Sequence, residues 1–190
     1  MFQSFCTNEA NTPNKMKTLF LLSAALLIAA SPSLRAKTIK YPEKAPAFSI
    51  TLPDGWTAKA DKDGNLDCES GDGSKFSFSI IAAQNITSDG ELKAYLPKLA
   101  ATMGEGAKLN DLKIGDVKEM TTANKVKLMG LNAHGQTEGV EMVISLAGFS
   151  PAKGSYFVIM GAESIEVDKA HDKDMGTILN SISPVMGDSD

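Results

Sequence analysis

Short runs in which apolar and polar residues alternate are the feature that most constrains the fold of this chain. Phe48–Leu52 and Phe76–Ile80 each place an apolar residue at every second position. Because successive side chains of a strand point to opposite faces, this spacing predicts two strands with one buried face each. A Pro-Asp-Gly turn at residues 53–55 ends the first run. The Asp- and Gly-rich stretch 61–73 predicts a tight loop that makes the two strands antiparallel neighbours.

Two segments carry the three- and four-residue apolar spacing of amphipathic helices. The first covers residues 92–103 and follows a capping box at Ser88–Glu91. Pro97 lies inside it, and an interior proline removes a backbone hydrogen bond, so we expect a kink near Lys93 or a restart at Pro97. The second predicted helix covers residues 167–182.

The remaining regular segments predict further strands and an α+β fold. Tyr156–Met160 is apolar without alternation, as expected for a strand covered on both faces. The order of strands, helix, strands, helix, with hairpin-length connections, favours a mostly antiparallel sheet with helices packed on its faces, an α/β/α sandwich. Three or four consecutive strands are expected between the helices, within residues 109–120, 126–133, 140–149 and 156–162.

The first strand and its turn also carry a family resemblance. Residues 48–56, Phe-Ser-Ile-Thr-Leu-Pro-Asp-Gly-Trp, resemble the opening block of the PsbP-like superfamily, and Ile178–Ile182 is similar to its C-terminal helix. Members of this superfamily include an extrinsic subunit of photosystem II and a Ran-binding transport factor. The resemblance implies the same α/β/α fold and an accessory or binding role. The resemblance does not identify any functional residue in this sequence.

An apolar run near the N-terminus predicts export. Leu19–Ala30 follows two lysines and precedes Ser-Pro-Ser-Leu-Arg-Ala at residues 31–36. The run has the length of a signal-peptide core and is shorter than the roughly 20 residues that span a bilayer. We therefore expect an N-terminal extension and signal peptide over 1–36 and a single domain over 37–190. Cleavage after Ala36 would release that domain to the periplasm or the extracellular space, with no stable membrane insertion.

The charge of the expected mature chain excludes nucleic-acid binding. Residues 37–190 hold 16 lysines and 22 acidic residues, a net charge of −6, and the sole arginine, Arg35, lies before the cleavage point. Without a basic stripe or a guanidinium fork, the domain lacks the groups that bind phosphate and guanine. No dinucleotide fingerprint or phosphate loop is present, so no cofactor is expected.

Cys68 is the sole cysteine of the expected mature domain, because Cys6 precedes the signal peptide. An internal disulfide is therefore excluded, and burial as a small apolar side chain is the simplest expectation for a lone cysteine in an oxidising compartment. We expect a monomer.

One stretch has the oxygen spacing of a calcium loop. Asp61, Asp63, Asn65 and Asp67 fall at positions 1, 3, 5 and 7 of an EF-hand-like pattern. Leu66 stands where that loop needs glycine, an aspartate stands at position 12, and the flanks read as strands. Asp and Gly clusters are also ordinary hairpin chemistry. These four residues are the metal candidates of the sequence, and we expect no calcium affinity tighter than about millimolar.

The remaining polar residues do not assemble a recognisable catalytic site. His134 is expected at a strand end and His171 within an apolar helix face, where a local hydrogen bond is commoner than catalysis. An acidic cluster around the second helix fits its positive N-terminal dipole: Glu163, Glu166, Asp168, Asp172 and Asp174.

Two functional classes follow. The first is a non-enzymatic binding or accessory module of the cell envelope, with an unknown protein or small-molecule partner. The alternative is a small hydrolase or metal-dependent enzyme whose site forms only in the fold. A cleft that places His134 or His171 beside two carboxylates with perturbed pKa would favour the enzyme. A continuous exposed apolar patch would favour the binding module.

Overall fold

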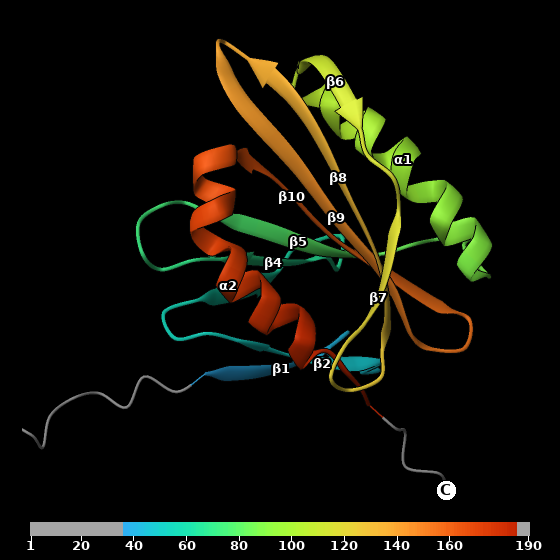
Figure 1. The fold of residues 1–190 in the computed structure, drawn as a ribbon. Coiled ribbons are helices and arrows are strands. Elements are labelled where there is room, and N and C mark those ends of the chain that lie inside the picture. The colour runs from blue at the N-terminus through green and yellow to red at the C-terminus, as the bar shows by residue number, and fades with distance from the viewer. Residues whose placement is uncertain (1–35, 186–190) are drawn as a thin grey trace, which may run out of the picture. The chain divides into compact units, whose positions relative to one another are not determined.

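An antiparallel sheet of eight strands forms the centre of the protein in the computed structural model, which describes residues 36–185 (Figure 1). Its strands follow the order β3-β4-β5-β10-β9-β8-β6, and β7 also pairs with β8. Two helices, α1 (Asp89–Gly106) and α2 (Ile165–Ser181), pack against it. The strands are β3 (Thr57–Ala60), β4 (Leu66–Glu69), β5 (Ser77–Ala82), β6 (Asn110–Ile114), β7 (Lys118–Thr121), β8 (Lys127–Thr137), β9 (Val140–Ala152) and β10 (Ser155–Ser164).

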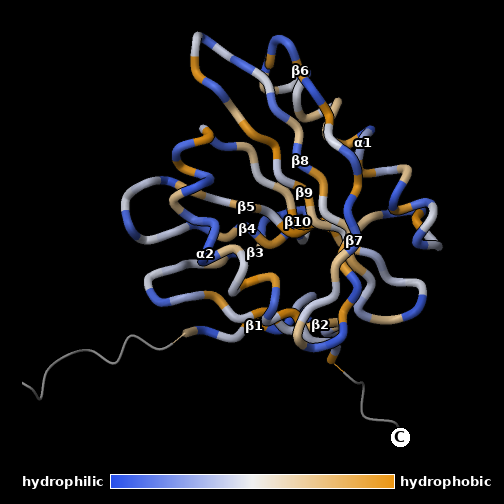
Figure 2. The backbone as a smooth tube through the Cα atoms, viewed as in Figure 1, coloured by the Kyte–Doolittle hydropathy of each residue, from blue (hydrophilic) through white to orange (hydrophobic). Residues whose placement is uncertain are grey.

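The two helices cover opposite faces of the sheet, as the α+β prediction required. Tyr156 and Val158 of β10 belong to the core under α1, whereas Phe157 and Ile159 belong to the core under α2. Strand β10 lies mid-sheet between β5 and β9, which explains why its apolar run has no alternation. Hydrophilic residues gather on the peripheral loops (Figure 2).

A smaller sheet corrects the expected pairing of the first strands. Strand β2 (Phe48–Leu52) pairs with β1 (Lys37–Tyr41) and β11 (Ser183–Pro184) in a separate three-stranded sheet. It is therefore not a neighbour of β5, and residues 61–73 are not one loop, because they contain β4. The predicted pairing was wrong because β4 is short and alternates only Leu66 and Cys68 with acidic residues, which resembles a turn in a single sequence.

Helix α1 runs without a break from Asp89 to Gly106, so the expected restart at Pro97 was wrong. The predicted cap at Ser88 is confirmed, because its side chain accepts a hydrogen bond from the Glu91 N–H at 3.3 Å. Leu92, Leu96 and Ala100 are buried at four-residue intervals. This packing against β8 and β9 offsets the hydrogen bond that a proline cannot donate.

The segment predicted as a strand over residues 109–120 is two strands. Both β6 and β7 pair with β8, and the chain between them approaches the sheet at Gly115, whose N–H donates to the Asn132 carbonyl at 2.9 Å. A Cβ at Gly115 would stand 2.9 Å from that oxygen, so a glycine is needed at this break.

The expected signal peptide lies outside residues 36–185. Within this range, neither helix has the length and apolarity to cross a bilayer.

Candidate functional site

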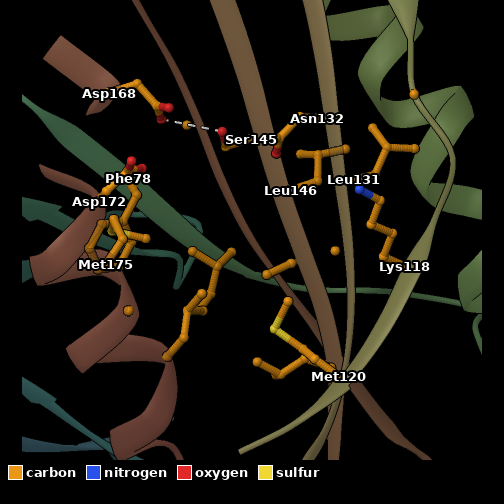
Figure 3. Close-up of a pocket in the computed structure, with 18 of the residues that line it drawn as sticks. Phe78, Lys118, Met120, Leu131, Asn132, Ser145, Leu146, Asp168, Asp172 and Met175 are labelled. Atoms are coloured by element: carbon orange, nitrogen blue, oxygen red, sulfur yellow. Dashed lines mark hydrogen bonds between the residues drawn. The ribbon is translucent and has the colours of Figure 1, made fainter. Parts of the chain in front are cut away.

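A groove of about 820 Å³ lies on the α2 side of the sheet, between α2 and the β6–β7 segment. Figure 3 shows Asp168, Asp172 and Met175 on the α2 wall and Lys118 and Met120 on the facing wall. The volume falls in the range of small-molecule sites, roughly 300 to 1,000 Å³.

Small side chains on three paired strands leave this space open. Gly130 of β8 stands opposite Ala147 of β9, and Ser145 of β9 stands opposite Gly161 of β10. All four residues line the groove. Since cross-strand partners lie side by side on one face of a sheet, these four short side chains form the floor of the groove, and Asn132 and Ile159 flank them in the same two rows.

Apolar side chains surround one part of the groove. Met120 of β7 is half exposed, and Ile114 of β6 is also exposed. They lie in the groove lining with four further large apolar side chains: Phe78, Ile159, Met175 and Leu179. Of these six, Met120 and Ile114 are exposed, Met175 and Leu179 are partly buried, and Phe78 and Ile159 belong to the buried core. The exposed apolar surface that the binding-module hypothesis requires is therefore limited to Met120 and Ile114 at the groove.

Carboxylates gather in another part of the lining. Glu163 accepts a hydrogen bond from the Ser77 N–H at 3.1 Å, and Asp168 accepts one from the Ser145 hydroxyl at 3.4 Å. Burial raises the pKa of Glu163, and the charge of Asp168 adds to this increase. Burial likewise raises the pKa of Asp168, with a contribution from the charge of Asp172. The carboxylates of Glu163 and Asp168 are therefore partly desolvated.

The two histidines have different environments. His134 is exposed on β8 and lines the groove, one cross-strand row from Asn132 and Ser145. Among residues 36–185, no hydrogen bond joins its ring to Glu163 or Asp168.

His171 is buried outside the groove lining and makes the local hydrogen bond that was expected. Its Nδ1 donates to the Val167 carbonyl at 2.8 Å, and its Nε2 lies 3.0 Å from an Asp72 oxygen. The ring stacks on Phe76 with centroids 4.4 Å apart. It therefore connects α2 to the loop between β4 and β5.

The four metal candidates lie around the β3–β4 hairpin. One Asp61 carboxylate oxygen accepts from the N–H groups of Asp63 and Asn65, both at 2.8 Å, and the other accepts from the Asn65 amide at 2.9 Å. Asp67 accepts from the Ser79 hydroxyl at 2.6 Å. In residues 36–185, no three histidine, cysteine or carboxylate side chains come together as a metal-binding group.

Sequence reasoning missed the groove itself. In the sequence, three acidic residues appear only as charges near a helix start: Glu163, Asp168 and Asp172. The tertiary structure shows that all three line the groove. Glycine and alanine within predicted strands are the one feature that could have indicated a hollow, since such residues leave a strand face unfilled.

Comparison with known proteins supports the fold. No family model matches the sequence, and no curated protein matches it. The structure resembles the cyanobacterial PsbP of Synechocystis sp. PCC 6803, with a TM-score of 0.61 and 8% identity over 80% of this chain and 94% of that chain. It also resembles LpqN of Mycobacterium tuberculosis, with a TM-score of 0.55 and 12% identity over 80% of this chain and 92% of that one. LpqN is described as involved in cell envelope biogenesis. The protein therefore has the PsbP-like fold that residues 48–56 predicted.

Proposed function

We propose that this protein is an exported, non-enzymatic binding module of the cell envelope, and that it holds a small ligand in the groove between α2 and β7. The floor of Gly130, Ser145, Ala147 and Gly161 carries the proposal, because it opens a hollow of the size in which proteins bind small ligands. Exposed Met120 and Ile114 beside it support a site that becomes covered on binding.

Export is supported by the signal-peptide pattern of residues 17–36, and a cell-envelope role by the description of LpqN, which shares the fold. Cleavage after Ala36 would leave β1 whole, since this strand begins at Lys37.

A groove-filling substitution tests the proposed site. A Cβ at Gly130 meets its nearest neighbour, Met120 Cε, at 3.8 Å, an ordinary contact, so Gly130→Leu keeps the fold and projects into the groove. Gly90→Leu is the matched control, because Gly90 is exposed on α1 with no atom within 4 Å of its Cβ position.

The readout is a screen of anionic, neutral and cationic fragments by heteronuclear NMR. We expect shift changes clustered on Asn132, Ser145 and Gly161, lost in Gly130→Leu and kept in Gly90→Leu. If no fragment of any charge shifts these residues, the groove is not a ligand site.

A hydrolase is the second candidate, because the groove lining includes His134 with Glu163 and Asp168, whose pKa values are both raised. Its test is turnover of nitrophenyl esters and phosphates. The enzyme reading requires activity that disappears in both His134→Ala and Asp168→Asn and persists in Glu105→Gln, an exposed carboxylate on α1. Equal rates in all four proteins exclude it for these substrates.

A further inference from the structure

Three carboxylates of the groove lining come from one stretch of the chain, because β10 continues directly into α2. Glu163 lies at the end of β10, Ser164 caps α2, and Asp168 and Asp172 follow four residues apart on one helix face. All three line the groove.

Within residues 36–185, no ion pair involves these three carboxylates. The ion pairs of this part of the chain involve other groups, namely Lys93, Lys127 and His171 with Glu119, Asp89 and Asp72. Glu163 and Asp168 instead accept hydrogen bonds from neutral donors of Ser77 and Ser145. Partial burial is the main cause of the raised pKa of both groups. The charge of Asp168 adds to it at Glu163, and the charge of Asp172 adds to it at Asp168, so a positive charge beside Asp168 would be stabilised.

The rest of the lining decides what kind of cation fits. The described residues contain no metal-binding cluster of three side chains, so a bare divalent ion lacks a coordination shell here. The groove continues instead into the apolar surface of Phe78, Met120, Met175 and Leu179. Methionine adapts its shape to varied apolar groups. Lys113 and Lys118 line the facing wall and disfavour a second positive charge on the same ligand.

We propose that the groove selects small organic monocations: an ammonium group bound beside Asp168, on the wall that Glu163 and Asp172 also line, with an apolar body against Met120 and Met175. This inference rests on the proposed function, since it names the ligand class of the same groove.

Three eight-carbon probes whose head groups carry a positive, no or a negative charge test the selection: octylammonium, octanol and octanoate, each titrated into the protein at neutral pH and followed by calorimetry and NMR. We expect octylammonium to bind about tenfold more tightly than octanol, the gain of one charge-assisted contact, and octanoate to bind most weakly. The shifts should map to Ser145 and Gly161.

Charge-removing variants locate the ammonium. Asp168→Asn and Asp172→Asn should each lower octylammonium affinity about three- to tenfold and leave octanol unchanged. Asp172 is exposed, so its variant keeps the fold even if Asp168→Asn is destabilised. Glu105→Gln, far along α1, should have no effect.

The outcomes separate the two proposals. Equal binding of the three probes, lost in Gly130→Leu, overturns the cation selection and leaves the groove a binding site. Binding of none of them at the groove overturns the selection, while the broader fragment screen decides the site independently. Displacement of octylammonium by calcium or magnesium at stoichiometric amounts would show a metal site instead, and also overturns the inference.

Discussion

At the scale of single residues, burial sets the reactivity of a side chain, which the residue type alone does not show. Cys68 lies in β4 between Ala58 of β3 and Phe78 of β5 and is buried, as expected. Burial, with the nearby charge of Asp67, raises the pKa of its thiol to about 12. The nucleophilic thiolate is therefore scarce at neutral pH.

We predict that Cys68 reacts with a chromogenic disulfide reagent at least about 100-fold more slowly in the folded protein than in denaturant. The folded protein buries the thiol and keeps it protonated, so the reagent meets little reactive thiolate. Rate measurements in buffer and in guanidinium chloride check this. Complete labelling within seconds in buffer, or a dimer that disappears on reduction, would contradict it.

His171 predicts a pH-dependent stability. Burial alone lowers its pKa, but hydrogen bonds to Val167 and Asp72, with the charges of Asp72 and Asp174, outweigh burial and raise the pKa above 6.5. A raised pKa means that the folded state binds the proton more tightly, so this contribution is complete below about pH 6.5 and is lost as pH rises through the folded pKa. The lowered pKa of Asp72, caused chiefly by hydrogen bonds from Ser74 and Ser70, keeps this carboxylate ionised throughout.

His171→Phe retains a ring beside Phe76 and removes the pair with Asp72. We expect the wild type to gain free energy of unfolding relative to this variant between about pH 8 and pH 6, measured by urea denaturation. A constant difference for His171→Phe would refute the role of the pair.

Among the secondary-structure elements, the β3–β4 hairpin explains why a calcium-like pattern need not bind calcium. The Asp61 carboxylate already accepts three hydrogen bonds from the turn that it caps, and these bonds lower its pKa. Gly64 supplies the positive φ of +82° that the turn requires.

We predict no calcium affinity tighter than about millimolar, because binding would have to replace these bonds. Calorimetry in chelator-treated buffer measures it. A stoichiometric micromolar isotherm that Asp61→Ala or Asp63→Ala abolishes would show a calcium site.

For the whole molecule, the order of elements places the groove next to two exposed large apolar side chains, Ile114 and Met120. Strands β6 and β7 pair with successive parts of β8, and Met120 of β7 lies on the groove wall that faces α2 across the floor (Figure 3). The groove is therefore lined by segments more than fifty residues apart in sequence, which include Met120 and Met175.

We also predict that the native protein is exported and begins near Lys37. The twelve-residue apolar run at 19–30 is too short to anchor it, and the small residues before Lys37 suit signal cleavage. Intact mass and N-terminal sequencing of the fractionated native protein check both points. A mature form that retains residues 19–30 would show that the segment is kept.

Patterns that act over a few residues were readable from the sequence alone. The alternation in β2 and β5, the cap at Ser88 and the unbroken apolar run of β10 depend on neighbours two to four positions away. Such spacing selects strand or helix directly, and the order of elements then favours an antiparallel sheet covered on both faces.

Pairing between strands far apart in the sequence decided the features that local patterns did not show. The sequence does not reveal that β2 leaves the main sheet to pair with β1 and β11, because strand partners are chosen by packing across the whole fold. The groove depends on the same choice. Gly130, Ala147 and Gly161 are unremarkable one by one, and they become a single hollow beside Asp168 only when the register of β8, β9 and β10 sets them in adjacent rows under α2.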